Sequence, residues 1–136
     1  MVQIDIEYPG QLKCIARHEP SGTTLITVPP KDNMGDGSSF SPTDLMATAL
    51  GTCIITTMAI AANKHGIDLS GATVRVQKIM STTPPRRIAK LPVVITITQQ
   101  IAADMRPRLE AAANACPVHQ TISHDTEMPI TFHWKD

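Results

Sequence analysis

The feature that most constrains this chain is an almost unbroken apolar stretch over residues 45–62. Ser41 is a favourable N-cap before it, a proline follows at the first helical position, and Asp44 stands where a capping box places its acid. After the stretch, a cationic turn precedes Gly66, which is a regular C-terminal signal. We therefore predict a helix from Ser41 to about His65, roughly 35 Å long at about 1.5 Å per residue.

This helix is apolar on nearly every face, so we expect it to be buried on nearly every face. A chain of 136 residues can hardly bury such a helix alone, and the helix therefore predicts a dimer. A membrane span is the alternative, but the stretch contains four threonines and Gly51 and has no flanking aromatic anchors. We favour a buried helix and expect no membrane partner.

The composition is that of a globular protein with one domain, residues 1–136. The formal net charge is zero, from 12 basic and 12 acidic side chains. This balance argues against nucleic acid as the partner, because phosphate binding needs a basic surface. The first residues alternate between apolar and charged types and do not resemble a signal peptide, and the three cysteines show no compact pairing pattern. We therefore expect a cytoplasmic protein in a reducing compartment.

Six other segments have the residue types and alternation of strands. They comprise residues 3–7, 12–17, 23–28, 73–80, 88–98 and 129–134. Turn signals separate them, including Tyr8-Pro9-Gly10 between the first two. A second helix is predicted over residues 104–115, and Pro117 restarts a short helical turn after it. The order is βββ-α-ββ-α-β, which is an α+β arrangement.

Cys53 lies near the middle of the long predicted helix. One interpretation is a small buried hydrophobic residue. The other is a protected thiol in an apolar pocket, which suits an organic hydroperoxide. Since burial raises the pKa of a thiol, the second interpretation requires a nearby cation or hydrogen-bond donor to form the thiolate.

Cys116 precedes Pro117 and is therefore predicted to be the N-cap of the short helical turn. Backbone N–H groups and the helix dipole would favour a thiolate there, and His119 would lie close, although a purely structural cap is the alternative. Cys14 is interpreted as a packing residue on the second strand. Cys116, His119 and His124 are residue types that bind metals, but their spacing matches no compact zinc motif, so we expect no metal.

Three stretches together resemble the OsmC/Ohr family, which includes osmotically inducible protein C and the organic hydroperoxide resistance proteins. They are Phe40-Ser41-Pro42-Thr43-Asp44-Leu45, Ala49-Leu50-Gly51-Thr52-Cys53 and Ala115-Cys116-Pro117-Val118-His119. The resemblance extends over nearly the whole order of elements. It implies an OsmC-like α+β fold and an intertwined homodimer whose two long helices are enclosed by sheets from both chains, with active sites at the dimer interface.

The resemblance also implies a peroxidatic Cys53 and a resolving Cys116. Cys53 would attack the peroxide and become a sulfenic acid, which condenses with Cys116 to a disulfide. An external dithiol or a lipoylated protein would then reduce the disulfide. No cofactor is implied.

In the hydroperoxide reductases an arginine, held by a glutamate, accompanies the reactive cysteine. The position that matches this glutamate is Thr43, and the acid, Asp44, follows it. At about 100° per residue, Asp44 points roughly 180° away from Cys53, so we interpret Asp44 as a capping residue. Arg17 is the candidate for the arginine, with Lys13 nearby as a poorer substitute. Arg86 and Arg87 are the alternatives.

The leading hypothesis is a thiol-dependent hydroperoxide reductase that uses Cys53 and Cys116, with Arg17 as a further catalytic residue. Two alternatives belong to other functional classes. The first is a protein that binds a small hydrophobic molecule in the dimer crevice. The second is a redox sensor that forms the disulfide with little peroxidase turnover.

Overall fold

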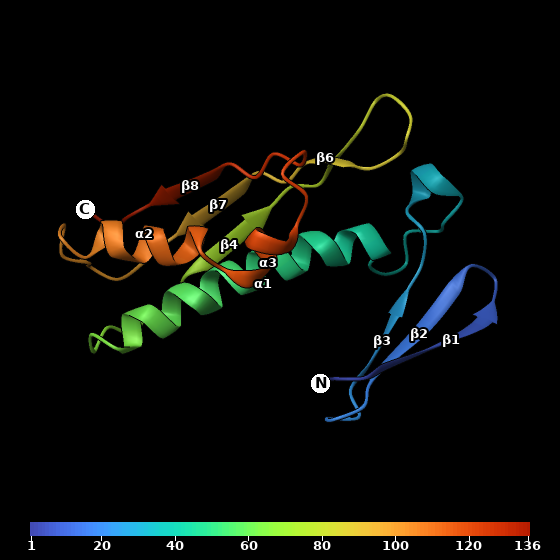
Figure 1. Cartoon of the computed structure of the whole chain (residues 1–136), viewed down its shortest axis with the longest axis horizontal. Helices are drawn as coiled ribbons and strands as arrows, with labels where there is room; N and C mark the ends of the chain where they lie inside the picture. The colour runs from blue at the N-terminus through green and yellow to red at the C-terminus, as the bar shows by residue number, and fades with distance from the viewer. The chain divides into compact units, whose positions relative to one another are not determined.

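The computed structural model describes residues 1–136 and divides into two compact units, Met1–Met46 and Ala47–Asp136. Figure 1 shows the elements of both units, and each unit is described by itself. The mixed α+β class and the order of the main elements agree with the prediction. A single domain over residues 1–136 stays a prediction.

The first unit contains an antiparallel sheet in the order β1-β2-β3. Its strands are β1 (Ile4–Gly10), β2 (Lys13–His18) and β3 (Thr24–Thr27), and a 3₁₀ helix, η1 (Lys31–Asn33), follows. The turn predicted at Tyr8-Pro9-Gly10 is wrong, because β1 continues through these residues and the chain reverses at Gln11 and Leu12. Pro9 is tolerated because the pairing of β1 with β2 is irregular between Glu7 and Gly10, where a missing N–H breaks no regular ladder.

One face of this sheet exposes large apolar side chains. Ile4 and Ile6 lie on the same face because they alternate with acidic residues along β1. Leu25 lies on that face too, since Ile6 pairs with Ala16 and Ala16 pairs with Leu25. These three side chains are 50%, 67% and 44% exposed, respectively. We call them the apolar sheet face, and a single chain leaves it uncovered.

The long helix, α1 (Pro42–Asn63), begins and ends on the predicted signals. Ser41 Oγ accepts a hydrogen bond from the Asp44 amide at 3.0 Å, and the Asp44 carboxylate accepts one from the Ser41 amide at 2.8 Å. This reciprocal pair is a capping box. Gly66, with a φ of 69°, terminates the helix, and the amide of the following residue donates to Ala62 O at 3.0 Å. These are the features of a Schellman motif.

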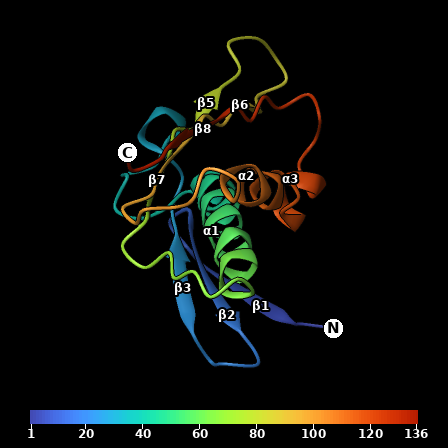
Figure 2. The same ribbon diagram turned by 90° about the vertical axis from the view of Figure 1, so that its left-hand side faces the viewer.

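The second unit has a sheet in the order β4-β7-β8, in which β4 and β7 are antiparallel and β7 and β8 are parallel. Its elements are β4 (Thr73–Val76), β5 (Ile79–Met80), β6 (Ile88–Lys90), β7 (Val93–Thr96), α2 (Arg106–Asn114), α3 (Pro117–Thr121) and β8 (Ile130–His133). β5 and β6 pair separately. The helices α1 and α2 lie on the same face of the three-stranded sheet (Figures 1 and 2).

The two long strands predicted in this unit are each divided. The segment 73–80 forms β4 and β5, and the segment 88–98 forms β6 and β7. Pro92 interrupts the second segment because it has no N–H to donate to a neighbouring strand. Its carbonyl instead accepts a hydrogen bond from the Gln77 amide at 3.0 Å, at the point where the first segment is also interrupted.

The core of the second unit forms between α1 and the sheet. The buried residues of α1 lie along one face and comprise Ala47, Leu50, Gly51, Ile54, Met58 and Ala62. All of these except Gly51 pack into one cluster with Leu91, Val93, Ile95, Ile97, Leu109 and Cys116. A single chain does not bury α1 on every face, which agrees with the expectation that a chain of this size can hardly do so alone: Thr48, Thr52, Thr56 and Ile60 are exposed. We call these four residues the outer face of α1.

By length and composition alone, α1 is apolar enough to cross a membrane. The same test is met by core helices of soluble proteins. The packing of one face of α1 into the core of the second unit is typical of such a helix.

Candidate active site

Cys53 occupies the middle of α1, which fixes its position relative to the core of the second unit. Its side chain is half-buried and packs against the buried cluster. Its sulfur lies 4.0 Å from Thr57 Oγ1, one helical turn later. Cys53 is therefore a thiol at the edge of an apolar core, with a hydroxyl as a near polar neighbour.

Cys116 is the N-cap of α3, as predicted, and Pro117 occupies the first helical position. Its Sγ accepts a hydrogen bond from the His119 amide at 3.3 Å. The side chain is fully buried among the core residues of the second unit. The sequence predicted that His119 would lie close to Cys116. The structure shows that the backbone amide of His119 makes this hydrogen bond.

The two thiols meet in the second unit. The Cys53 side chain is near enough to the Cys116 thiol to raise its pKa, and both cysteines are free. α1 supplies one sulfur and the turn between α2 and α3 supplies the other. Two neighbouring free thiols are the starting arrangement for a reversible disulfide.

Burial raises the pKa of Cys116 above its ordinary value of 9.0, against the lowering by the His119 amide, and the contact with Cys53 raises it further. The cap lowers the pKa of Cys116, as expected, but burial and the neighbouring Cys53 outweigh it, so the expected preference for a thiolate is not met. The cap exists, but α3 has only five residues and the sulfur is removed from water. Cys116 is consequently the thiol that keeps its proton.

Arg17 lies on β2 in the first unit, on the face opposite the apolar sheet face. Its Nη1 donates to Glu19 Oε1 at 2.9 Å, and both side chains are substantially exposed. Glu19 was not identified from the sequence as the acid that pairs with Arg17. The signal that could have found it is the position of this carboxylate, two residues after Arg17. Lys13 also lies on β2, where it lines a pocket of the first unit. Neither residue belongs to the unit that holds the two thiols.

The alternative arginines follow the loop between β5 and β6. Arg87 donates through Nη1 to the carbonyl oxygens of Ile88 and Asp125, at 3.2 and 3.3 Å, and so ties two loops together. Arg86 is exposed beside it. Asp44 takes the capping role expected from its helical angle. Cys14, interpreted as a packing residue, is half-buried on β2 opposite Thr27.

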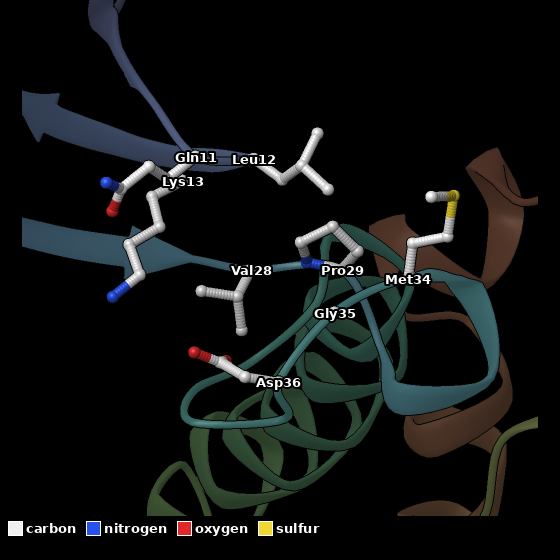
Figure 3. A pocket seen from close by; sticks show the side chains of 8 residues that line it. All are labelled: Gln11, Leu12, Lys13, Val28, Pro29, Met34, Gly35 and Asp36. Atoms are coloured by element: carbon white, nitrogen blue, oxygen red, sulfur yellow. The ribbon is translucent and has the colours of Figure 1, made fainter.

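The first unit contains a separate pocket of about 130 Å³ (Figure 3). It is lined by Gln11, Leu12, Lys13, Val28, Pro29, Met34, Gly35 and Asp36. The pKa of Asp36 is lowered, mainly by hydrogen bonds from Ser38 and to a lesser extent by the charge of Lys13. No cysteine lines this pocket, and both thiols of the candidate redox pair lie in the second unit.

Comparisons with known proteins identify the family. The sequence matches the OsmC-like protein family over residues 35–131, so the chain belongs to this family. No curated protein matches the sequence.

Solved structures of the family share the fold. A protein of Psychrobacter arcticus described as an osmotic stress induced and detoxification response protein is 35% identical, with a TM-score of 0.92, 98% of this chain covered and 96% of that chain. An organic hydroperoxide resistance protein OsmC of Legionella pneumophila is 19% identical, with a TM-score of 0.74 and coverages of 98% and 96%. The organic hydroperoxide resistance protein OhrB of Bacillus subtilis is 12% identical, with a TM-score of 0.72 and coverages of 97% for both chains.

Proposed function

We propose that this protein is a thiol-dependent reductase of organic hydroperoxides, with Cys53 and Cys116 as its redox pair. The observation that carries the proposal is that these two free thiols lie at the same core cluster of the second unit, near enough for Cys53 to raise the pKa of Cys116. Family membership supports it, because some structural relatives are named organic hydroperoxide resistance proteins.

Cys53 is the attacking thiol because it is the more accessible of the two. Its side chain is half-buried, whereas Cys116 has no exposed surface. The Cys53 thiolate attacks the outer peroxide oxygen, and the O–O bond breaks. The electron pair leaves with the other oxygen, which takes a proton from water and departs as an alcohol. Cys53 becomes a sulfenic acid.

Cys116 then completes the reaction as the resolving thiol. Its sulfur bonds to the Cys53 sulfur, and the sulfenic oxygen leaves as water with the Cys116 proton. A small dithiol or a lipoylated protein reduces the disulfide and is itself oxidised to a disulfide, which restores both thiols. The protein needs no metal or organic cofactor for these steps.

The functional form is proposed to be a cytoplasmic homodimer. The apolar sheet face is exposed in one chain. The outer face of α1 is exposed as well, and it includes a large aliphatic residue, Ile60. Exposed apolar patches of this kind mark association sites. In a dimer Arg17 would assist as the cation beside Cys53.

Turnover with cumene hydroperoxide and dihydrolipoamide tests the function. The parent protein should consume peroxide catalytically, and Cys53→Ser should abolish consumption because no attacking thiol remains. With dihydrolipoamide omitted, Cys116→Ser should consume a single equivalent of peroxide and leave Cys53 as a sulfenic acid, whereas the parent should form the disulfide. Cys14→Ala is the control and should retain the parent rate, since Cys14 lies on a strand of the other unit. A Cys53→Ser protein as active as the parent would refute the assignment.

A further inference from the structure

Two groups that carry a donor hydrogen lie near the Cys53 sulfur. Thr57 lies one turn after Cys53 on the same helix, and its hydroxyl is 4.0 Å from the sulfur, within the range of a weak hydrogen bond to sulfur. Cys116 is the second neighbour and lies across the contact between α1 and the α2–α3 turn. Both groups carry an uncharged donor hydrogen.

Thr57 differs from Thr52, on the same helix, in the group that its hydroxyl contacts. Thr52 directs its hydroxyl back to the carbonyl oxygen of Thr48, at 2.7 Å, which is the usual arrangement for threonine within a helix. The Thr57 hydroxyl instead lies beside the Cys53 sulfur, and either atom can be the donor. Because Thr57 is half-buried, this hydroxyl acts where water competes little for the hydrogen bond.

Cys116 is oriented by its own cap. The His119 amide donates to the Cys116 sulfur at 3.3 Å, which leaves the S–H hydrogen of Cys116 available for Cys53. Full burial keeps this thiol in its neutral form. The His119 amide thus donates to the Cys116 sulfur, and the neutral Cys116 thiol and the Thr57 hydroxyl each carry a hydrogen that can be donated to the Cys53 sulfur.

We propose that the Thr57 hydroxyl and the Cys116 S–H are the two donors that orient and stabilise the Cys53 thiolate before it attacks the peroxide. This inference rests on the proposed function and adds two roles to it: Thr57 becomes an activating residue, and Cys116 acts before it resolves the sulfenic acid. Hydrogen bonds to the charged form of a group favour that form. Both donors belong to the second unit, so they act on Cys53 whatever cation also approaches it.

The Thr57 arm of the test measures alkylation of Cys53 by iodoacetamide in a Cys14→Ala, Cys116→Ser background, where Cys53 is the remaining cysteine. Thr57→Val preserves the shape and removes the donor, and it should slow alkylation on the order of three- to tenfold near neutral pH. Thr57→Ser retains the donor and should remain within about twofold of the parent. At about pH 10, where thiols are largely ionised, the difference should disappear.

Thr56→Val is the matched control, because Thr56 is the adjacent threonine on the outer face of α1. It should not change the alkylation rate. Equal rates for Thr57→Val and Thr57→Ser, or a deficit that persists at about pH 10, would overturn the role of Thr57. Far-UV circular dichroism of each variant establishes that α1 is intact.

The Cys116 arm compares Cys116→Ser with Cys116→Ala in a Cys14→Ala background. Serine retains a donor hydrogen and alanine does not, so alkylation of Cys53 should be slower in the alanine variant. Equal rates would contradict the donor role of Cys116. Alkylation needs no peroxide, so it is measured independently of the proposed reductase activity. If the variants show the expected alkylation rates but the parent does not turn over peroxide, the proposed function is refuted and the inference stands. If the parent turns over peroxide but the variants alkylate at the parent rate, the inference is refuted and the proposed function stands.

Discussion

At the scale of single residues, Cys116 shows two opposing effects on one thiol. The Cys-Pro pair correctly predicted an N-cap, because capping depends on neighbouring residues in the chain. The full burial of Cys116 depends on the packing of α2, α3 and the sheet around it, and no local pattern contains that information. Desolvation prevails, and the thiol is neutral.

The raised pKa of Cys116 predicts a loss of stability in alkaline solution. The unfolded chain ionises this thiol at a lower pH than the folded protein does, so its stabilising contribution is complete below the ordinary value of 9.0 and is lost as pH rises through the higher folded pKa. The free energy of unfolding should therefore fall with pH in this range, by up to about 1.4 kcal/mol per pH unit.

Urea unfolding of reduced protein at a series of alkaline pH values measures this effect. Cys116→Ser removes the titrating thiol and should show a shallower decline than the parent, while Cys14→Ala should decline as the parent does. Identical slopes for the parent and Cys116→Ser would contradict the assignment.

The hairpin between β1 and β2 contains strained residues. Gln11 and Leu12 have φ values of 57° and 60°. This is the left-handed region, which is unfavourable for most residues other than glycine and asparagine. The Tyr8 hydroxyl accepts a hydrogen bond from the Leu12 amide at 3.3 Å and helps to hold the turn. Figure 3 shows the Leu12 side chain at the pocket of the first unit.

Replacement of Leu12 by glycine should relieve this strain. We expect Leu12→Gly to raise the free energy of unfolding by about 1 kcal/mol, measured by urea denaturation. Leu25→Gly is the control, because Leu25 is similarly exposed, at 44% against 48%, but lies within β3. It should lower stability. Equal losses in both variants would show that the turn is not strained.

At the scale of elements, the approach of α1 to β4 depends on Gly51. A Cβ atom at this position would lie 2.8 Å from Val76 Cγ2 and 3.4 Å from Val74 Cγ1. The sequence showed a glycine within an apolar helix but not its neighbour, because β4 lies well beyond α1 in the chain.

Gly51→Ala should therefore destabilise the second unit despite the better helix propensity of alanine. Overpacking costs about 1–3 kcal/mol, and the propensity gain of about 1 kcal/mol offsets only part of it. In a Val76→Ala background the clash is absent, so the same substitution should become stabilising. The sign reversal, measured by thermal or urea unfolding, is the test; a destabilising effect of equal size in both backgrounds would contradict the contact.

The elements also show how far sequence patterns reach. The ends of α1 were predicted accurately, because the capping box and the Schellman motif involve residues within one turn. The division of the long strands was not predicted, since it depends on Pro92 meeting Gln77 across the sheet. The contact between Cys53 and Cys116 was likewise implied by resemblance to a family and not by spacing.

At the scale of the whole molecule, one chain leaves the apolar sheet face and the outer face of α1 exposed. We expect sedimentation to give twice the chain mass of 14.7 kDa. Ile6→Glu places a charge on the apolar sheet face and should shift the protein toward the monomer, because a buried unpaired charge is costly. The control, Glu7→Gln, alters the opposite face of β1 and should leave the dimer intact. A stable folded monomer of the parent chain would contradict the dimer.

The central claim is that peroxide joins Cys53 to Cys116. Its most direct test is peptide mapping of the reduced protein after treatment with about one equivalent of cumene hydroperoxide, with intact mass recorded in parallel. We predict a loss of about 2 Da and a single disulfide between the peptides that contain Cys53 and Cys116. Retention of both thiols, or a disulfide that includes Cys14, would contradict the account.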